Sequence, residues 1–296
     1  MMTRRRFLRG SALGLTVAGS AAVGYGFWEA AHIRIERETV PVPNLPPAFA
    51  GKTVAVLADL HHGPLVGIDF IRSAVEITNA LAPDIIALVG DYAHKGAQAH
   101  EELPPCLEAL SALKAPMGVF AVPGNHDMPQ GGKLYRKLIA GTTLTDLTNQ
   151  NRKLTIGNES LYVAGVDDLW WGRPNVYDAL IGIPLGEPVI LLSHNPDFAE
   201  DSPDARVGLM LSGHTHGGQI YVPGVGASWV PSKYGMKYRR GFVRGPKSNV
   251  FVSRGLGEAG VPIRLNVPPE INLLMLAAGR TTPWRTTSSE KRAANP

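Results

Sequence analysis

Five short apolar runs along this chain each end in side chains that can bind a metal ion. The most informative is 207–211, which is followed by His214 and His216 bracketed by glycines. A short apolar run bounded by glycine is typical of a buried strand. The runs 54–58, 85–89, 119–122 and 189–192 are followed by Asp59-Leu60-His61, Gly90-Asp91, Gly124-Asn125-His126-Asp127 and His194, respectively. We therefore expect five strand ends to bring Asp, Asn and His side chains together at one edge of a sheet.

The spacing of these runs indicates an α/β fold. Between residues 52 and 122 the strand-like runs alternate with helical patterns at 68–81 and 101–113. Such alternation favours mainly parallel strands covered by helices. Later strand-like runs lie closer together, at 153–156, 161–164, 189–192, 207–211, 219–222, 249–253 and 271–277. They predict a second, more antiparallel sheet that faces the first, with helices outside.

Charge and cysteine content exclude several function classes. The formal net charge is +4, and four arginines against Glu29 place +3 of it within residues 1–31. The remainder is close to neutral, so composition gives no support to a nucleic-acid partner, which would need a basic stripe on the folded domain. The single cysteine, Cys106, excludes an intramolecular disulfide and a thiolate-rich zinc site.

The N-terminus has the pattern of an export signal. Arg4, Arg5, Arg6 and Arg9 precede an uncharged run of 18 residues at 10–27. The arginine pair followed by Phe7 and Leu8 resembles a twin-arginine (Tat) signal, which is recognised by the Tat export machinery. The alternative is a membrane anchor, since 18 residues is the lower edge of spanning length. Both alternatives place the catalytic domain in the periplasm or on the outer face of the cytoplasmic membrane.

Four regions are expected along the chain. Residues 1–31 form the signal or anchor, and residues 32–50, with four prolines, form a stiff connector. Residues 51–279 form the catalytic domain. Residues 280–296 are polar and are predicted to be disordered.

The strand-end side chains suit a site for two metal ions. Carboxylate, amide oxygen and imidazole are ligands for divalent ions such as Mn²⁺, Fe²⁺ and Zn²⁺. Asp91 is the best candidate for a carboxylate shared by two ions, because it follows Gly90 at the end of the central strand. The chain offers seven candidate ligands, which are Asp59, His61, Asp91, Asn125, His194, His214 and His216.

Taken in order, these fragments resemble the calcineurin-like metallophosphoesterase superfamily over residues 52–278. The resemblance implies a four-layer α/β/β/α sandwich and a metal-dependent hydrolase of phosphoric ester bonds. It implies one ion on Asp59, His61, Asp91 and His216, and a second on Asp91, Asn125, His194 and His214. The segments 166–168, 213–220, 253–257, 262–264 and 268–271 further resemble an exported, membrane-associated branch similar to the bacterial YkuE and YaeI phosphoesterases.

The same resemblance implies a mechanism. Water activated by the two ions, with Mn²⁺ expected and Fe²⁺ or Zn²⁺ as alternatives, attacks phosphorus in line with the leaving group. His126 faces the substrate, where it protonates the leaving group or binds a phosphoryl oxygen. Asp127 either orients His126 or caps the following helix.

The choice of substrate is expected to lie in the basic, aromatic segment 205–257, which contains no Asp or Glu. This segment is either a solvated loop or a lid over the metals. Arg239 and Arg254, together with Arg264, are predicted to bind an anionic phosphate substrate of the cell envelope, such as a phospholipid or glycolipid at a membrane surface. The alternatives are a UDP-2,3-diacylglucosamine pyrophosphatase of lipid A synthesis, a nuclease or cyclic-nucleotide phosphodiesterase, and a non-catalytic metal-binding scaffold.

Overall fold

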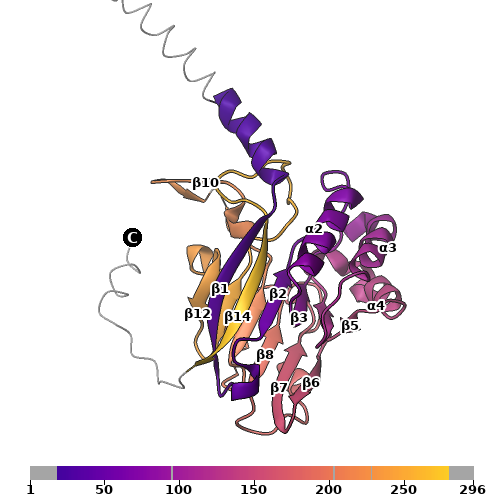
Figure 1. Ribbon diagram of the computed structural model, residues 1–296. Coiled ribbons are helices and arrows are strands. Elements are labelled where there is room, and N and C mark those ends of the chain that lie inside the picture. The colour runs from indigo at the N-terminus through magenta and orange to yellow at the C-terminus, as the bar shows by residue number, and fades with distance from the viewer. Residues whose placement is uncertain (1–18, 95, 203, 228, 280–296) are drawn as a thin grey trace, which may run out of the picture.

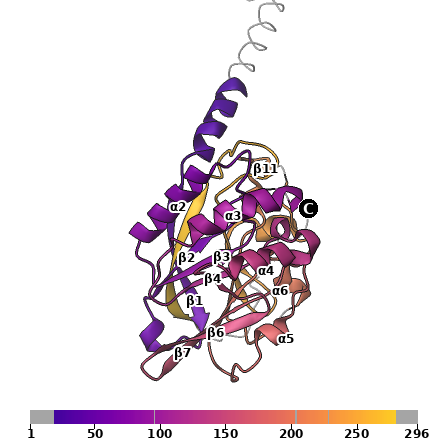
Figure 2. The same cartoon turned by 90° about the vertical axis from the view of Figure 1, so that its right-hand side faces the viewer.

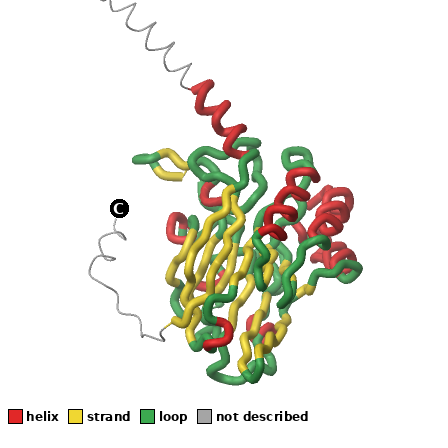
Figure 3. Tube along the Cα trace, in the orientation of Figure 1, coloured by secondary structure: helices red, strands yellow, loops and turns green. Residues whose placement is uncertain are grey.

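Two six-stranded sheets stack face to face in this computed structural model, which describes residues 19–94, 96–202, 204–227 and 229–279 (Figures 1 and 3). The first sheet has the order β1 (Arg34–Pro43), β14 (Glu270–Gly279), β2 (Thr53–Leu57), β3 (Ile85–Val89), β4 (Val119–Val122) and β5 (Thr145–Asp146). The second has the order β12 (Gly241–Arg244), β13 (Asn249–Val252), β9 (Leu209–Ser212), β8 (Val189–Leu192), β7 (Glu159–Gly165) and β6 (Gln150–Ile156).

Helices cover the outer faces of the sheets. Figure 2 shows α2 (Ile68–Ala80), α3 (Ala99–Leu110) and α4 (Lys133–Ile139) over the first sheet. The short helices α5 (Val176–Ala179) and α6 (Phe198–Asp201) pack with the second. The remaining elements are the hairpin β10 (Tyr221–Val222) and β11 (Gly226–Ala227), and the 3₁₀ turns Pro47–Phe49, Gly96–Gln98, Asn125–Asp127, Pro129–Gly132, His216–Gly218 and Gly235–Tyr238.

Three apolar clusters hold the four layers together. One lies between the first sheet and its helices and includes Leu88 and Leu107. A second lies between the sheets, where Val56 and Ile190 belong to the same cluster. The third joins the second sheet to α5 and α6 through residues such as Phe198. The predicted α/β/β/α sandwich is therefore confirmed.

The second sheet is less antiparallel than the sequence predicts. Strands β7, β8, β9 and β13 pair in parallel, and only the outer strands β6 and β12 pair antiparallel. Parallel neighbours need crossover connections. Two of the three run through α5 and α6, which have four residues each and leave no helical period in the sequence, and the third, from β9 to β13, runs through residues 213–248. The last run, 271–277, belongs to β14 in the first sheet instead.

The connector predicted over residues 32–50 is wrong, because most of it is strand β1. All ten residues of β1 pair in parallel with β14, from Arg34 opposite Glu270 to Pro43 opposite Gly279. Proline lacks an N–H group, but β1 is an edge strand, where a missing donor is tolerated. The folded domain therefore starts well before residue 51.

A helix at residues 19–30 precedes β1; it projects from the domain and contacts it only near the C-terminal end of the helix (Figure 1). The backbone N–H of Arg264 donates to the Gly26 carbonyl at 3.1 Å, and that of Val267 donates to Glu29 Oε2 at 3.2 Å. In the described part of the chain, no helix has the length and apolar character to cross a membrane. The arginines of the predicted export signal and the predicted disordered tail both lie outside the described residues.

Candidate metal centre

The loops that follow β2, β3, β4, β8 and β9 meet at one place and bring the seven candidate ligands together. Each of three groups of side chains has its donor atoms within 4.8 Å of one another. Asn125 joins them through its Oδ1, which lies 3.1 Å from His194 Nε2. The groups are Asp59 with His61 and His216, His61 with Asp91 and His126, and Asp91 with His194 and His214.

The distances between donor atoms fit divalent cations. His61 Nε2 lies 3.1 Å from His216 Nε2, and His214 Nδ1 lies 3.1 Å from His194 Nε2. Two facing imidazole nitrogens share at most one proton, whereas a cation satisfies both lone pairs. With the Asp59 and Asp91 carboxylates alongside, this donor set is one that divalent ions accept.

Backbone contacts orient these side chains. His194 Nδ1 lies 2.8 Å from the Val89 carbonyl and donates to it, which leaves Nε2 as the ligand nitrogen. The Asp59 carboxylate accepts the His214 N–H at 2.9 and 3.0 Å. Asp91 Oδ1 accepts the N–H of His126 at 2.9 Å. Each contact joins two different loops, so the site is held by the fold and not by single side chains.

Burial and close charges set the protonation of the cluster. Burial and the nearby Asp91 carboxylate together raise the pKa of Asp59 to about 7, although His194 acts in the opposite direction. Burial lowers the pKa of His61 and His214 to about 3, so both are neutral, which is the form of imidazole that binds metal. For His194 burial acts downward, but the nearby carboxylates of Asp91, Asp59 and Asp168 together raise the pKa to about 10, so a cation bound at Nε2 would replace a proton there.

Left-handed backbone is concentrated at the candidate ligands. Residues other than glycine rarely adopt this conformation, which persists where the surroundings enforce it. Neighbouring glycines make room: a Cβ on Gly124 would lie 2.2 Å from Asp91 Oδ1, and one on Gly213 would lie 2.4 Å from Asp59 Oδ2. The left-handed ligands, with φ between 47° and 71°, are Asp59, His61, Asp91, His214 and His216.

Comparison with known proteins decides the family. A model of the calcineurin-like phosphoesterases matches residues 52–218, which span four of the five loops and His214 and His216 of the fifth. The chain belongs to the calcineurin-like phosphoesterase family. It is therefore a metal-dependent hydrolase of phosphoric ester bonds, as the sequence fragments predict.

Bacterial relatives of this phosphoesterase match almost its whole length. An uncharacterized metallophosphoesterase, YkuE from Bacillus subtilis, is 31% identical over 93% of this chain and 98% of its own. Phosphodiesterase YaeI from Escherichia coli is 32% identical over 93% of this chain and 100% of its own. A solved dimetal phosphatase from Danio rerio, 12% identical, covers 72% of this chain and 90% of its own at a TM-score of 0.42, too low to add to the sequence relationship.

In this phosphoesterase the two predicted catalytic residues have different surroundings. His126 is half-buried, its ring lies edge-on to that of His61 at 4.7 Å between centroids, and its Nδ1 contacts the carbonyl of His94. Asp127 is fully buried, and its carboxylate accepts three backbone N–H groups, from Tyr92, Ala93 and Gly124, at 2.9 to 3.1 Å. Asp127 therefore neither orients His126 nor caps the following helix, the two roles predicted for it; its carboxylate closes its own turn, Asn125–Asp127, and joins that turn to the loop after β3.

Asp127→Asn is expected to destabilise the phosphoesterase by about 1–3 kcal/mol, because an amide cannot accept all three backbone N–H groups. The urea midpoint of the metal-loaded protein measures this effect. If the urea midpoint is unchanged and activity is lost, the structural role is contradicted and Asp127 is catalytic.

Two of the three arginines predicted to bind substrate are occupied elsewhere. Arg264 is fully buried and donates to the carbonyls of Arg254, Gly257 and Val267. Arg254 is also buried and forms ion pairs with Glu270 and, at 2.7 Å, with Glu36. Neither guanidinium is available to a substrate, so both predictions are wrong.

Arg239 remains at the rim of the site, together with an aromatic residue that the sequence did not single out. Arg239 is half-buried, donates to the Gly217 carbonyl at 3.1 Å and lies 4.4 Å above the centroid of the Tyr221 ring. Trp170 is 46% exposed, and its ring lies edge-on to His214 at 4.3 Å. The Asp168 carboxylate accepts the N–H of Trp170 at 2.9 Å, so this acidic side chain caps a turn that presents the tryptophan.

Proposed function

We propose that this phosphoesterase hydrolyses a phosphodiester or related phosphoester of an anionic envelope substrate, with two divalent ions bound in its cluster. One observation carries the two-ion assignment. Asp91 Oδ2 lies 3.4 Å from His61 Nε2 and 3.2 Å from His194 Nε2, so one carboxylate oxygen faces a ligand of each ion. That position suits a bridging carboxylate.

The proposed ligand sets follow the three groups. Bound divalent ions would activate a water molecule and neutralise charge on the phosphoryl group. Mn²⁺ is proposed, with Fe²⁺ and Zn²⁺ as alternatives, because the donors are oxygens and imidazoles. One ion would be held by Asp59, His61, Asp91 and His216, and the other by Asp91, Asn125, His194 and His214.

His126 is proposed to exchange a proton with the substrate or to bind a phosphoryl oxygen. Its Nδ1 faces the carbonyl of His94 and therefore carries a proton, so Nε2 is the nitrogen left for the substrate. A side chain positioned to transfer one proton to or from the reacting oxygen typically accelerates a reaction by about 10²–10⁴-fold.

His126→Ala is expected to lower kcat by at least about 10²-fold while both metal ions are retained. Elemental analysis and steady-state kinetics on the same preparation measure both quantities. His100→Ala is the matched control, since His100 is exposed on α3, and it should change neither. Loss of one metal equivalent from His126→Ala would instead make His126 a ligand, in line with its place near His61 and Asp91.

The envelope substrate is supported by the rim and by the N-terminal sequence. Trp170, Trp171 and Trp229 are exposed at 46%, 69% and 65%, and amphipathic aromatic side chains suit the boundary between water and lipid. Export by the Tat machinery and residence in the periplasm or on the outer face of the cytoplasmic membrane are proposed from the arginines at 4–6. A diester is proposed first because the relative YaeI is named a phosphodiesterase.

The function is tested on protein stripped of metal and reloaded with Mn²⁺, Fe²⁺ or Zn²⁺. Hydrolysis of bis(4-nitrophenyl) phosphate should disappear on chelation, return with Mn²⁺ and exceed that of 4-nitrophenyl phosphate. A panel of phospholipids, UDP-2,3-diacylglucosamine, single-stranded DNA and cyclic AMP then identifies the substrate class. Preference for DNA or cyclic AMP would overturn the envelope substrate, and inactivity with every metal would overturn the hydrolase.

A further inference from the structure

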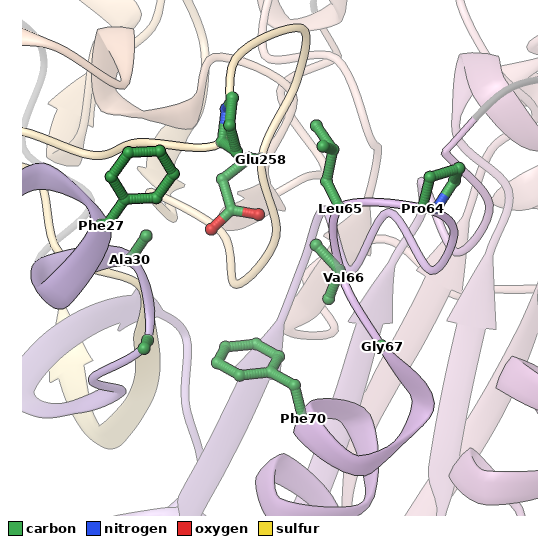
Figure 4. A pocket seen from close by; sticks show the side chains of 10 residues that line it. Phe27, Ala30, Pro64, Leu65, Val66, Gly67, Phe70 and Glu258 are labelled. Atoms are coloured by element: carbon green, nitrogen blue, oxygen red, sulfur yellow. The ribbon is translucent and has the colours of Figure 1, made fainter.

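An apolar cavity of about 340 Å³ lies between the helix at 19–30 and the loop that joins β2 to α2. Figure 4 shows side chains from three separate parts of the chain around it. The cavity is near the lower end of the size range of ligand pockets in proteins. Its main lining residues are Phe27, Leu65, Val66, Phe70, Glu258 and Pro262.

Loops that carry candidate metal ligands continue into the walls of the cavity. Pro64 lies three residues after His61 on the same loop. Glu258 follows Gly257, whose N–H donates to the Asp59 carbonyl at 2.6 Å. Gly257 has no room for a side chain, because a Cβ would lie 2.2 Å from the Leu60 carbonyl oxygen. Both walls are therefore continuous with loops that carry candidate ligands.

Gln219 fixes the second wall to the histidine loop. It lies three residues after His216, and its Nε2 donates to the carbonyls of Val261 and Ile263 at 2.7 and 3.1 Å. Its Oε1 accepts the N–H of Ala259 at 2.9 Å. The segment that carries Glu258 and Pro262 therefore has a fixed position relative to the metal ligands.

Glu258 is the polar group of this cavity. Its side chain is 6% exposed, and its carboxyl group faces the space between Phe27, Val66 and Phe70 (Figure 4). It forms no hydrogen bond or ion pair with any residue that the structure describes. Burial raises its pKa to about 7, although Arg264 acts in the opposite direction. The carboxyl oxygens of Glu258 are not fully buried, so they open onto the cavity. A carboxyl group that faces mostly apolar side chains gains from a hydrogen-bond donor, so the cavity suits a ligand that brings one.

We propose that this cavity binds an apolar chain of the substrate, with a hydroxyl or amide N–H of the same molecule donating to Glu258. The proposal rests on the function proposed above and makes the substrate an amphiphile whose phosphoester reaches the metals while its chain lies beside α2. The volume holds part of one chain and not a complete diacyl lipid. The helix at 19–30 supplies Phe27 and Ala30, so the proposed substrate site includes residues of the predicted signal or anchor segment 1–31 and requires that this segment be retained.

Gly67 allows the cavity to be filled without disturbing the fold. It lines the cavity, has φ −70° and ψ 157°, and a Cβ there would meet no atom within 4 Å. Gly67→Leu therefore places a side chain in open space. Gly141→Leu is the matched control on the outer helical layer, where the nearest atom to a Cβ is the Leu138 carbonyl oxygen at 3.4 Å.

The first measurement compares 4-nitrophenyl dodecyl phosphate, below its micelle-forming concentration, with 4-nitrophenyl methyl phosphate. The metal-loaded protein should show a kcat/KM ratio of at least about ten in favour of the dodecyl ester, because the cavity buries methylene groups. Gly67→Leu should lower the dodecyl-to-methyl ratio of kcat/KM by at least about five-fold, because its side chain takes up space that the methylene groups would occupy. Gly141→Leu should leave this ratio unchanged.

The second measurement needs no turnover. Binding of N-dansyl-dodecylamine, a fluorescent chain with one N–H donor, should be weakened by Gly67→Leu and by Glu258→Leu. Glu258→Gln keeps an acceptor oxygen and should bind nearly as the unchanged protein does. A ratio near one, with dansyl binding insensitive to Gly67→Leu, would overturn the chain subsite while the phosphoesterase stands. Absence of turnover of both esters, with dansyl binding intact and sensitive to Gly67→Leu, would overturn the proposed function and leave the subsite.

Discussion

Asp91→Asn is expected to lower kcat/KM on a chromogenic phosphodiester by at least about 10³-fold, a loss of roughly 4 kcal/mol of transition-state stabilisation. The Asp91 carboxylate stands between His61 and His194 and also accepts the N–H of His126. An amide has one acceptor oxygen and no negative charge, so it cannot serve both ions. We expect the metal content to fall together with the rate.

Asp84→Asn is the control for this change. Asp84 directly precedes β3, at the other end of the strand that leads to Asp91, and binds Lys52 Nζ and the Thr53 N–H, each at 2.8 Å. Its replacement should lower stability modestly and leave metal content and kcat/KM unchanged. Activity of Asp91→Asn within a few-fold of the unchanged protein would contradict the bridging role.

Gly90→Ala is expected to have the next largest effect, lowering kcat/KM by about 10²-fold or more through displacement of the ligand loops. Gly90 has φ +90°, and a Cβ there would lie 2.5 Å from the backbone nitrogen of Gly124. The chain cannot relieve this overlap by turning a side chain, because the obstacle is backbone. The Gly124 loop, which carries Asn125 and His126, must therefore move away from Asp91.

Gly51→Ala is the control that distinguishes the effect of this atomic overlap from the effect of a strained backbone. Gly51 also has a left-handed backbone, with φ +82°, but a Cβ there would meet no atom within 4 Å. It should cost about 1–2 kcal/mol of stability and leave the rate unchanged. Thermal unfolding and kinetics on both variants make the comparison. Equal losses of rate would contradict the view that the close approach at Gly90 positions the site.

The candidate site could be predicted because its information is local. Each ligand follows an apolar strand within four residues. The strands β2, β3 and β4 belong to the first sheet and β8 and β9 to the second, so the site lies where the edges of two sheets meet, whereas the sequence predicts one edge of a single sheet. The sequence shows glycines beside the ligands but does not show why glycine is needed there. Gly124 and Gly213 leave space for the carboxylates of Asp91 and Asp59, which lie far away along the chain.

The errors concern residues whose role depends on distant partners. Arg254 pairs with Glu36, 218 positions away, and Arg264 binds three carbonyls inside the domain, so no local pattern separates them from a rim arginine such as Arg239. The sequence predicts a connector where strand β1 lies, because prolines disfavour a central strand. Only the sheet order shows that β1 is an edge strand, where proline is tolerated. The short helices α5 and α6 are four residues each and carry no detectable period.

The position of β14 has a consequence for how the chain acquires its structure during synthesis. Among the strands that the structure describes, the last in sequence, β14, lies between two of the first, with β1 on one side and β2 on the other. Ten residue pairs join it to β1 and four join it to β2. Contacts between such remote segments form late and slow folding. Until residues 270–279 emerge, β1 has no neighbour in its sheet, so a nascent chain cannot build this sheet stepwise from its N-terminus.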